Sequence, residues 1–305
     1  MICAGNGYED ERAFSELVRR VEGHGYSTFF VPDHFVDHPL APTVALAHAA
    51  ALTTTLRVGS LMLGNDYKHP VVLAREMATL DRLSDGRLEL GIGAGWMTAD
   101  YDKSGMALDP PGTRIGRLAE SITILKGLFA PGAFSFSGDH YTVRDLDGHP
   151  KPVQQPLPFC IGGGGPRVLA LAAREAQIVG VNANLRDGVG DSAGAISSLT
   201  AMATDAKLAH LRAAAGADFA DLEIQTLVGF THLTGDSAPI FEMMAANFGV
   251  TPDDARMAPV TLVGTEGEIV DLLEARRDRW QMSYIVVGAD AVDSFAPIVA
   301  RLNGR

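Results

Sequence analysis

The sequence predicts an α/β protein of the (β/α)8 TIM-barrel class, and three observations carry that prediction. Short apolar runs alternate with longer amphipathic segments along the 305 residues, giving about eight strand-plus-helix units. Strands that alternate with helices pair in parallel with right-handed crossovers. About eight such units suit a closed barrel, whereas an open doubly wound sheet needs only about five or six strands. We therefore expect a single barrel domain over residues 1–305.

The first half of the chain supplies four of these units. A strand near residues 2–5 lies very close to the start, and the helix after it has Phe14, Leu17, Val18 and Val21 at the spacing of one helix face. The later units repeat this pattern, and Asp85-Gly86 ends one helix. The expected strands are 28–31, 57–63 and 88–92, and the expected helices are 10–23, 42–53, 71–83 and 113–129.

The second half continues in the same way, with a proline close to the start of the helix that follows strand 159–161. An Ala-rich stretch predicts one long helix over 193–215. The other expected strands are 178–181, 223–231 and 284–287, and the other expected helices are 166–176, 265–280 and 294–302.

Two stretches interrupt the alternation and are predicted to be insertions. Residues 131–158 contain short β-like pieces around the turn Ser137-Gly138-Asp139, which indicates a small hairpin before the fifth strand. Residues 234–259 are rich in methionine and predict helices before the last helix–strand unit. Insertions of this kind often form the rim of an active site, and we expect that of both.

The composition excludes several function classes. A net charge of −12 argues against a nucleic-acid partner, because phosphate backbones need clustered Lys and Arg. The two cysteines, Cys3 and Cys160, lie in apolar stretches and are expected to be structural thiols. We expect no membrane span, because the chain has no apolar run of about 18 residues. With no leader segment visible either, the expected compartment is the cytoplasm.

The most informative segment for function runs from Cys160 through four glycines, Gly162, Gly163, Gly164 and Gly165, to Pro166 and Arg167. It joins a strand to a helix, where free backbone N–H groups and the helix dipole favour an anion. It is neither a Walker A loop nor a complete dinucleotide fingerprint. The alternative is a flexible turn, but barrel phosphate sites typically lie on late strand-to-helix loops, which favours phosphate binding.

Other strand ends add further candidates, because barrel active sites lie at the carboxyl ends of the strands. Asp33 and His34 follow the second strand, and a histidine there can donate a hydrogen bond or relay a proton. A structural His34 that simply pairs with Asp33 is the alternative. The third and fourth strands end in Gly64-Asn65 and in Ala94-Gly95-Trp96, where small residues leave room for a flat ring.

Several missing motifs narrow the chemistry. The chain has no His-x-His at a strand end and no His-Glu-x-x-His, so we expect no metal. No lysine lies inside a strand, which disfavours a Schiff-base aldolase. A barrel without metal ligands or an obvious nucleophile is expected to take its reactivity from an organic cofactor.

These strand ends resemble the bacterial-luciferase-like superfamily of flavin and deazaflavin oxidoreductases. The resemblance covers nearly the whole chain and is most specific over residues 81–96; it is nearest to the coenzyme F420-dependent branch. It implies a barrel that binds F420 or FMN at its carboxyl face, with the phosphate on Gly164 and Gly165 and an active-site histidine at His34. It also implies a bulge after the third strand, often with a non-proline cis peptide, which would fall near Gly64-Asn65.

Two departures from the family pattern matter for function. In the F420-dependent sugar-phosphate dehydrogenases of this family, a proton-donating Glu stands where this chain has Trp96, which we expect to line the substrate pocket instead. The family also has several more residues before Ile2, so we expect either that the true start lies further upstream or that the first strand is incomplete.

The leading hypothesis is hydride transfer between F420 and a small-molecule substrate, with His34 and Asp33 as catalytic candidates. The ring would lie near Gly64, Asn65, Ala94 and Gly95. A two-component monooxygenase using reduced FMN, with a separate reductase, is the alternative in the same fold. A non-catalytic flavin-binding barrel and a phosphate-binding aldolase or isomerase are further alternatives. The resemblance also suggests a homodimer.

Overall fold

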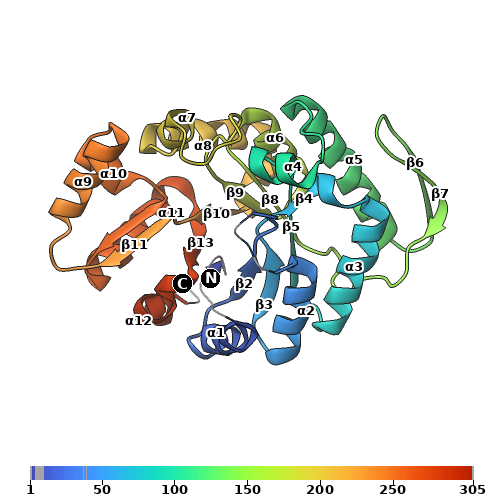
Figure 1. Ribbon diagram of the computed structural model, residues 1–305, viewed down its shortest axis with the longest axis horizontal. Helices are drawn as coiled ribbons and strands as arrows, with labels where there is room; N and C mark the ends of the chain where they lie inside the picture. The colour runs from blue at the N-terminus through green and yellow to red at the C-terminus, as the bar shows by residue number, and fades with distance from the viewer. Residues whose placement is uncertain (1, 4–9, 37, 39, 304–305) are drawn as a thin grey trace.

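The computed structural model describes residues 2–3, 10–36, 38 and 40–303, and its central feature is a closed ring of parallel strands. The ring runs β3-β2-β1-β13-β10-β9-β8-β5, and β5 pairs back onto β3 through Val58 with Leu88 and Gly59 with Glu89. Helices surround it (Figure 1). The predicted (β/α)8 barrel is confirmed.

The elements follow the predicted alternation closely. The barrel strands are β1 (Ile2–Cys3), β2 (Thr28–Val31), β3 (Arg57–Ser60) with its continuation β4 (Leu63–Gly64), β5 (Leu88–Gly93), β8 (Phe159–Gly163), β9 (Ile178–Val181), β10 (Glu223–Leu227) and β13 (Met282–Gly288). The helices around them are α1 (Glu11–Gly23), α2 (Pro42–Leu52), α3 (Pro70–Leu83), α4 (Thr98–Ser104), α5 (Pro111–Phe129), α6 (Pro166–Glu175), α7 (Ala193–Ser197), α8 (Ala201–Ala215), α11 (Glu266–Trp280) and α12 (Val292–Leu302).

Alternation along each strand divides the core into two parts. Phe29 and Val31 belong to the large cluster between the ring and its helices, whereas Phe30 of the same β2 strand lies inside the barrel with Cys160 and Tyr284. The interior is therefore packed, and only its two ends are available for polar chemistry.

The third strand is interrupted where the sequence predicted one continuous strand over 57–63. A non-proline cis peptide joins Leu61 to Met62, between β3 and β4. The expected position near Gly64-Asn65 was therefore wrong by three residues: Gly64 ends β4, and Asn65 begins the short 3-10 helix η1 (Asn65–Tyr67).

The predicted long helix over 193–215 is in fact two helices, α7 and α8. The side chain of Thr200 accepts a hydrogen bond from the Ala203 amide and caps α8, so the chain restarts there. Composition alone missed the break, because a Ser or Thr that caps a helix looks the same in the sequence as one inside it.

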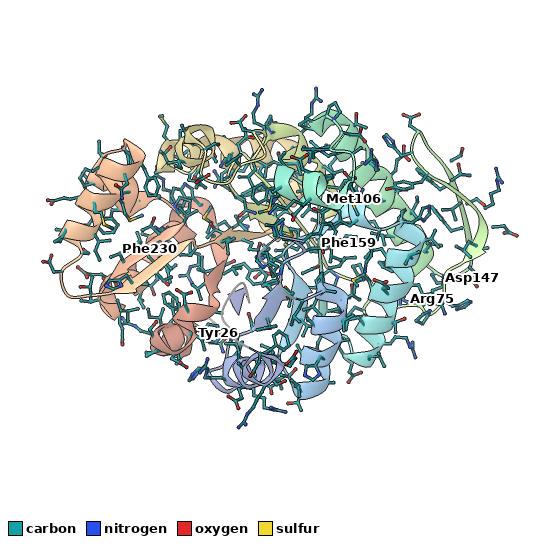
Figure 2. The ribbon with its side chains drawn as sticks, viewed as in Figure 1. Tyr26, Arg75, Met106, Asp147, Phe159 and Phe230 are labelled. Atoms are coloured by element: carbon teal, nitrogen blue, oxygen red, sulfur yellow. The ribbon has the colours of Figure 1, made fainter. Side chains whose placement is uncertain are left out.

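The hairpin predicted within 131–158 is present as β6 (Ala133–Ser137) and β7 (Thr142–Asp147). It follows α5, a helix that returns the chain to the amino-terminal end of the barrel, and the turn at its tip is held from α5 by Glu120, which accepts from the amides of Asp139 and Tyr141. Arg75 and Asp147 line a cavity of about 350 Å³ on this side (Figure 2). The hairpin packs against the outer side of α5 (Figure 1), and the expectation that this insertion forms the active-site rim stays a prediction.

The second insertion is larger than predicted. The barrel strand β10 ends at Leu227, and the chain then forms β11 (Phe230–Leu233), α9 (Ala238–Phe248), α10 (Pro252–Met257) and β12 (Thr261–Gly264). β11 and β12 pair in parallel in a sheet of their own, so Thr231 lies outside the barrel strand that the sequence predicted. The lobe stands beside the barrel and carries Phe230, well apart from Phe159 in the ring (Figures 1 and 2). The predicted helices are present; the strand β12 was missed.

The short first strand pairs in parallel with both β2 and β13, so it completes the ring with two residues. The prediction for residues 4–5 and for the Cys3 side chain lies outside the described residues. Cys160 is buried, and burial raises the pKa of its thiol well above the usual value, which is the behaviour of an inert core thiol. None of the described helices is both long and apolar enough to cross a bilayer.

Candidate active site at the carboxyl-terminal mouth

We call the carboxyl end of the barrel the mouth. It is formed by the ends of five strands, at His34, Gly64, Gly95, Gly164 and Asn182. Its strongest side-chain contact joins His34, after β2, to Asp100 in the first turn of α4: Nδ1 lies 2.6 Å from Oδ2. The His34 side chain is 17% exposed and that of Asp100 is fully buried. His34 is therefore held from one side and accessible from another.

Asp100 determines which ring nitrogen of His34 carries the proton. Burial alone would raise the pKa of this carboxyl group, but the hydrogen bond from His34 and those from the amides of Phe35 and Val36 outweigh burial and lower it. The ionised carboxylate only accepts hydrogen bonds, so Nδ1 of His34 carries the proton. Its Nε2 has no hydrogen-bond partner among the described residues.

Asp33 points to a different partner. Its Oδ2 accepts a hydrogen bond from the Gly64 amide at 3.0 Å, which ties the end of β2 to the end of β4. Burial raises the pKa of the Asp33 carboxyl group despite the opposing effect of the Gly64 amide and Lys68. The alternative of a structural His34 paired with Asp33 therefore fails: the partner of His34 is Asp100.

Trp96 closes one side of the histidine. The two rings pack edge to face with centroids 5.6 Å apart, and His38 lies 5.2 Å from His34 on another side. Across the mouth, the Trp96 ring lies against Gly190 of the loop after β9. Trp96 thus lies next to His34, and its place in a substrate pocket stays a prediction.

The strand end at Ala94 and Gly95 is held from α5. Arg114 donates hydrogen bonds to both carbonyl oxygens, at 3.1 Å for Ala94. Gly95 has φ +75°, and a side chain there would collide with the Tyr101 hydroxyl at 2.0 Å, so only glycine fits. At this edge of the mouth the backbone is therefore held in place, and Gly95 contributes no side chain.

Asn65 lies at the bottom of the same edge. It is 2% exposed, and its Nδ2 is a buried donor without an acceptor among the described residues. The next residue, Asp66, is held by Tyr101 and Arg117, which fixes η1 in place. Buried polar groups are normally paired, so this amide is open to a water molecule or to a ligand group.

The four glycines that end β8 and continue into the loop after it do not share one environment. A side chain at Gly162 would meet Met62 inside the barrel, and one at Gly163 would meet Val168 of α6. At Gly164 it would meet the Ala183 carbonyl at 2.3 Å, but at Gly165 it would meet nothing within 4 Å. Gly164 packs against the next loop, and Gly165 faces open space.

Gly165 is the N-cap of α6, whose first turn is not capped by any side chain. The amides of Gly164 and Gly165 have no acceptor in the described structure. Arg167 stands in the first turn, beside Gly112 of α5, and has no ion pair with any described residue. The positive charge of Arg167 is unfavourable beside the positive end of the helix dipole unless an anion lies between them. The N-terminus of α6 can therefore accept an anion.

Comparison with known proteins adds the family. The family model described as luciferase-like monooxygenase matches residues 3–238, more than half of the chain. The chain belongs to the luciferase-like monooxygenase family. The resemblance stated from the strand-end motifs is confirmed.

Two curated relatives and one solved structure are similar to this luciferase-like chain. An F420-dependent glucose-6-phosphate dehydrogenase of Amycolatopsis mediterranei is 31% identical over 170 residues, covering 53% of this chain and 51% of the relative. An FMNH(2)-dependent dimethylsulfone monooxygenase of Pseudomonas putida is 31% identical over 149 residues, covering 48% and 41%. The chain spans between about two fifths and three fifths of the length of the curated relatives it matches.

A solved F420-dependent secondary alcohol dehydrogenase in complex with an F420–acetone adduct superposes with a TM-score of 0.77. It covers 99% of this chain and 98% of its own, at 17% sequence identity. At that identity the likeness concerns the fold, and it agrees with the closed barrel described above.

The structure of this luciferase-like barrel adds three residues that the sequence reasoning did not single out. Asp100 lies four positions after Trp96, and an acidic residue in a helix first turn was a usable signal. Met62 and Arg167 gave no such signal: the first matters because of the bulge after β3, and the second because of its position in front of α6. The described residues contain no cluster of three or more His, Cys, Asp or Glu side chains arranged around a metal position.

Proposed function

We propose that this protein is an oxidoreductase that transfers a hydride between coenzyme F420 and a small organic substrate. The observation that carries the proposal is that one mouth holds both an anion-accepting helix end and a histidine held in one tautomer. The luciferase-like family and its F420-dependent and FMNH2-dependent relatives support a deazaflavin or flavin cofactor. F420 is the more specific part of the proposal.

The residues present fit such a cofactor. The amides of Gly164 and Gly165, together with Arg167, would hold its phosphate, since the space beyond Gly165 is open. The bare edge at Ala94 and Gly95 and the unpaired Nδ2 of Asn65 would face its ring. The chain itself therefore provides an anion site and a flat polar edge at one mouth.

The bound deazaflavin would supply the hydride acceptor or donor, and the protein would contribute positioning, proton handling and exclusion of water. His34 would hold or deliver a proton at Nε2, because its Nδ1 is committed to Asp100. Asp33 would act from the neighbouring strand end, through the Gly64 amide that shapes the ring edge. Trp96 would bound the substrate next to His34.

Trp96 also bears on the class of substrate that this site would accept. The relative from Amycolatopsis is an F420-dependent glucose-6-phosphate dehydrogenase. The resemblance to this family implies that its F420-dependent sugar-phosphate dehydrogenases carry a proton-donating Glu where this chain has Trp96. An indole neither donates a proton to chemistry at neutral pH nor binds a sugar phosphate by charge. We therefore propose a less polar substrate than a sugar phosphate.

Cofactor titration tests the proposal directly. The purified protein is mixed separately with F420 and with FMN, and ligand fluorescence is followed to give a dissociation constant for each. Binding of F420, with its reduction or oxidation on addition of a substrate, is the expected result. Tight FMN binding with no response to F420 would overturn the F420 assignment.

The FMNH2-dependent relative supports a second candidate, a two-component monooxygenase that receives reduced FMN from a separate reductase. Oxygen uptake that depends on added reduced FMN would select it over the F420 reaction. A homodimer stays a prediction from the resemblance, to be tested by light scattering.

A further inference from the structure

The inner wall of the barrel below the mouth is nearly free of side chains on three neighbouring strands. Inward positions on β5, β8 and β9 are glycines: Gly93, Gly162 and Gly180. A side chain at Gly162 would meet the Met62 methyl at 2.7 Å, and one at Gly180 would meet the amides of Asn182 and Gln225 at 3.1 and 3.2 Å. Met62 and these two amides therefore occupy the space beside the wall.

Gln225 is the unusual member of this group. It lies on β10 with 0% exposure, and neither Nε2 nor Oε1 has a nitrogen or oxygen hydrogen-bond partner in the described structure. Its side chain lies beside the Cys160 thiol inside the barrel, a weak hydrogen-bonding group whose pKa this contact lowers against the larger effect of burial. Leaving a buried amide unpaired costs about 1–3 kcal/mol for each group, so Gln225 must have a purpose or a partner that the fold does not supply.

Asn182 stands above Gln225 at the end of β9. Its backbone is fixed on both sides, because its N–H donates to the Gly163 carbonyl at 3.1 Å and Lys207 donates to its carbonyl at 2.7 Å. Its side-chain amide has no hydrogen bond to any described residue. Two unpaired carboxamides thus flank one glycine wall, a few ångströms from the loop that would hold a phosphate.

We propose that Gln225 and Asn182 form an amide pair that binds the imide edge of a planar heterocycle lying against this wall. A carboxamide offers one donor and one acceptor, which complement the alternating carbonyl, N–H and carbonyl groups of a pyrimidinedione. Flavin and deazaflavin share that edge. Met62 is unbranched and flexible, so its side chain can yield the space on binding. The inference rests on the proposed cofactor class and assigns residues within its site.

Three variants and three probes test the pair. Gln225→Met keeps the shape of the side chain and removes both polar atoms, and Asn182→Leu does the same at β9. Thr226→Val is the matched control: it removes an equally buried, unpaired hydroxyl on the same strand, which alternation places on the opposite face. The probes are F420, FMN and lumichrome, which has the imide edge but neither chain nor phosphate.

Each amide variant is expected to weaken probe binding about tenfold and to shift the absorption band of the bound ring, whereas Thr226→Val binds as wild type does. Wild-type affinity in Gln225→Met would overturn the proposal. A ligand-free Tm well below wild type in Gln225→Met would also overturn it, since the amide would then serve the fold.

The two proposals fail separately. If wild type binds neither F420 nor FMN, the proposed function fails, and weaker lumichrome binding by Gln225→Met would still support the amide pair. If wild type binds the cofactors and both amide variants bind them equally well, only the amide pair fails. Binding of none of the three probes would overturn both.

Discussion

The two ends of the barrel interior differ in how their buried polar atoms are paired. At the amino end, the Glu89 carboxylate accepts hydrogen bonds from Arg57 at 2.7 Å, from Thr28 at 3.2 Å and from the Tyr284 hydroxyl. We call these four residues the floor. At the mouth Asn65 keeps a buried amide atom without a partner among the described residues, and on the wall just below it so does Gln225.

This difference separates stability from function. The floor is a closed network: burial and the neighbouring Glu89 raise the pKa of Tyr284 well above its usual value, so its hydroxyl stays a donor to the carboxylate. A network that is satisfied within the protein stabilises the fold, whereas buried amides with open positions can be completed by a ligand or by water. Changes at the floor should therefore affect unfolding, and changes at the mouth should affect binding and turnover.

The largest expected effect is on turnover at the mouth. His34→Ala removes the group that holds a proton near the ring, so kcat should fall by ~10²–10⁴-fold while the cofactor dissociation constant stays near the wild-type value. Steady-state kinetics and fluorescence titration measure the two quantities. Unchanged turnover would show that His34 is not catalytic, and no turnover by wild type with any substrate tested would favour a non-catalytic flavin-binding barrel.

At the floor, Glu89→Ala should lower stability and leave binding unchanged. It removes the shared acceptor of Arg57, Thr28 and Tyr284, and because Arg57 keeps partial access to water the expected loss is about 2–3 kcal/mol of unfolding free energy. Denaturant melts measure it, with the exposed Glu242→Ala on α9 as control. A cofactor affinity that fell together with stability would break the distinction between the two ends.

Asp100→Asn tests the positioning of His34. The two carboxylate oxygens accept from His34, from Tyr67 and from the amides of Phe35 and Val36, and a carboxamide has only one acceptor oxygen for them. We expect kcat to fall about 10–100-fold, with a smaller effect on KM. A rise in KM without a fall in kcat would assign Asp100 to the substrate pocket instead.

The same variant makes a pH prediction. The folded-state pKa of Asp100 is lower than its ordinary 3.8, so its carboxylate contributes stability that is present above that pH and is lost as the pH falls through the lower folded value. The stability difference between wild type and Asp100→Asn should therefore be constant near neutral pH and shrink below about pH 4. Melts from pH 7 to pH 2 measure it, and a difference that grows on acidification would contradict the assignment.

The smallest expected effect is at the glycine loop. Gly165→Ala adds a methyl group that meets no protein atom within 4 Å, at φ −93°, so stability should not change. The methyl would enter the space in front of α6, and affinity for FMN or F420 should fall about tenfold while lumichrome binding is unaffected. Equal losses for all three probes would place the phosphate elsewhere.

Much of the fold was predictable because each element carries its own local signal. Phe14, Leu17, Val18 and Val21 mark the buried face of α1, and all four are buried in the structure. The predictions failed where distant partners decide: the interruption of the third strand at Leu61–Met62 and the separation of β11 from β10.

By itself the sequence determined the barrel class, the glycine loop before α6 and the histidine after β2, since periodicity and backbone requirements are local properties. Only the tertiary structure decided which carboxylate faces His34, which of the four glycines borders open space, and which buried amides stay unpaired. Those outcomes depend on side chains brought together from different strands, such as His34 with Asp100 and Gly180 with Gln225. The spacing of residues along the sequence does not encode these contacts, because the distances between side chains on different strands are set only when the strands close into the ring.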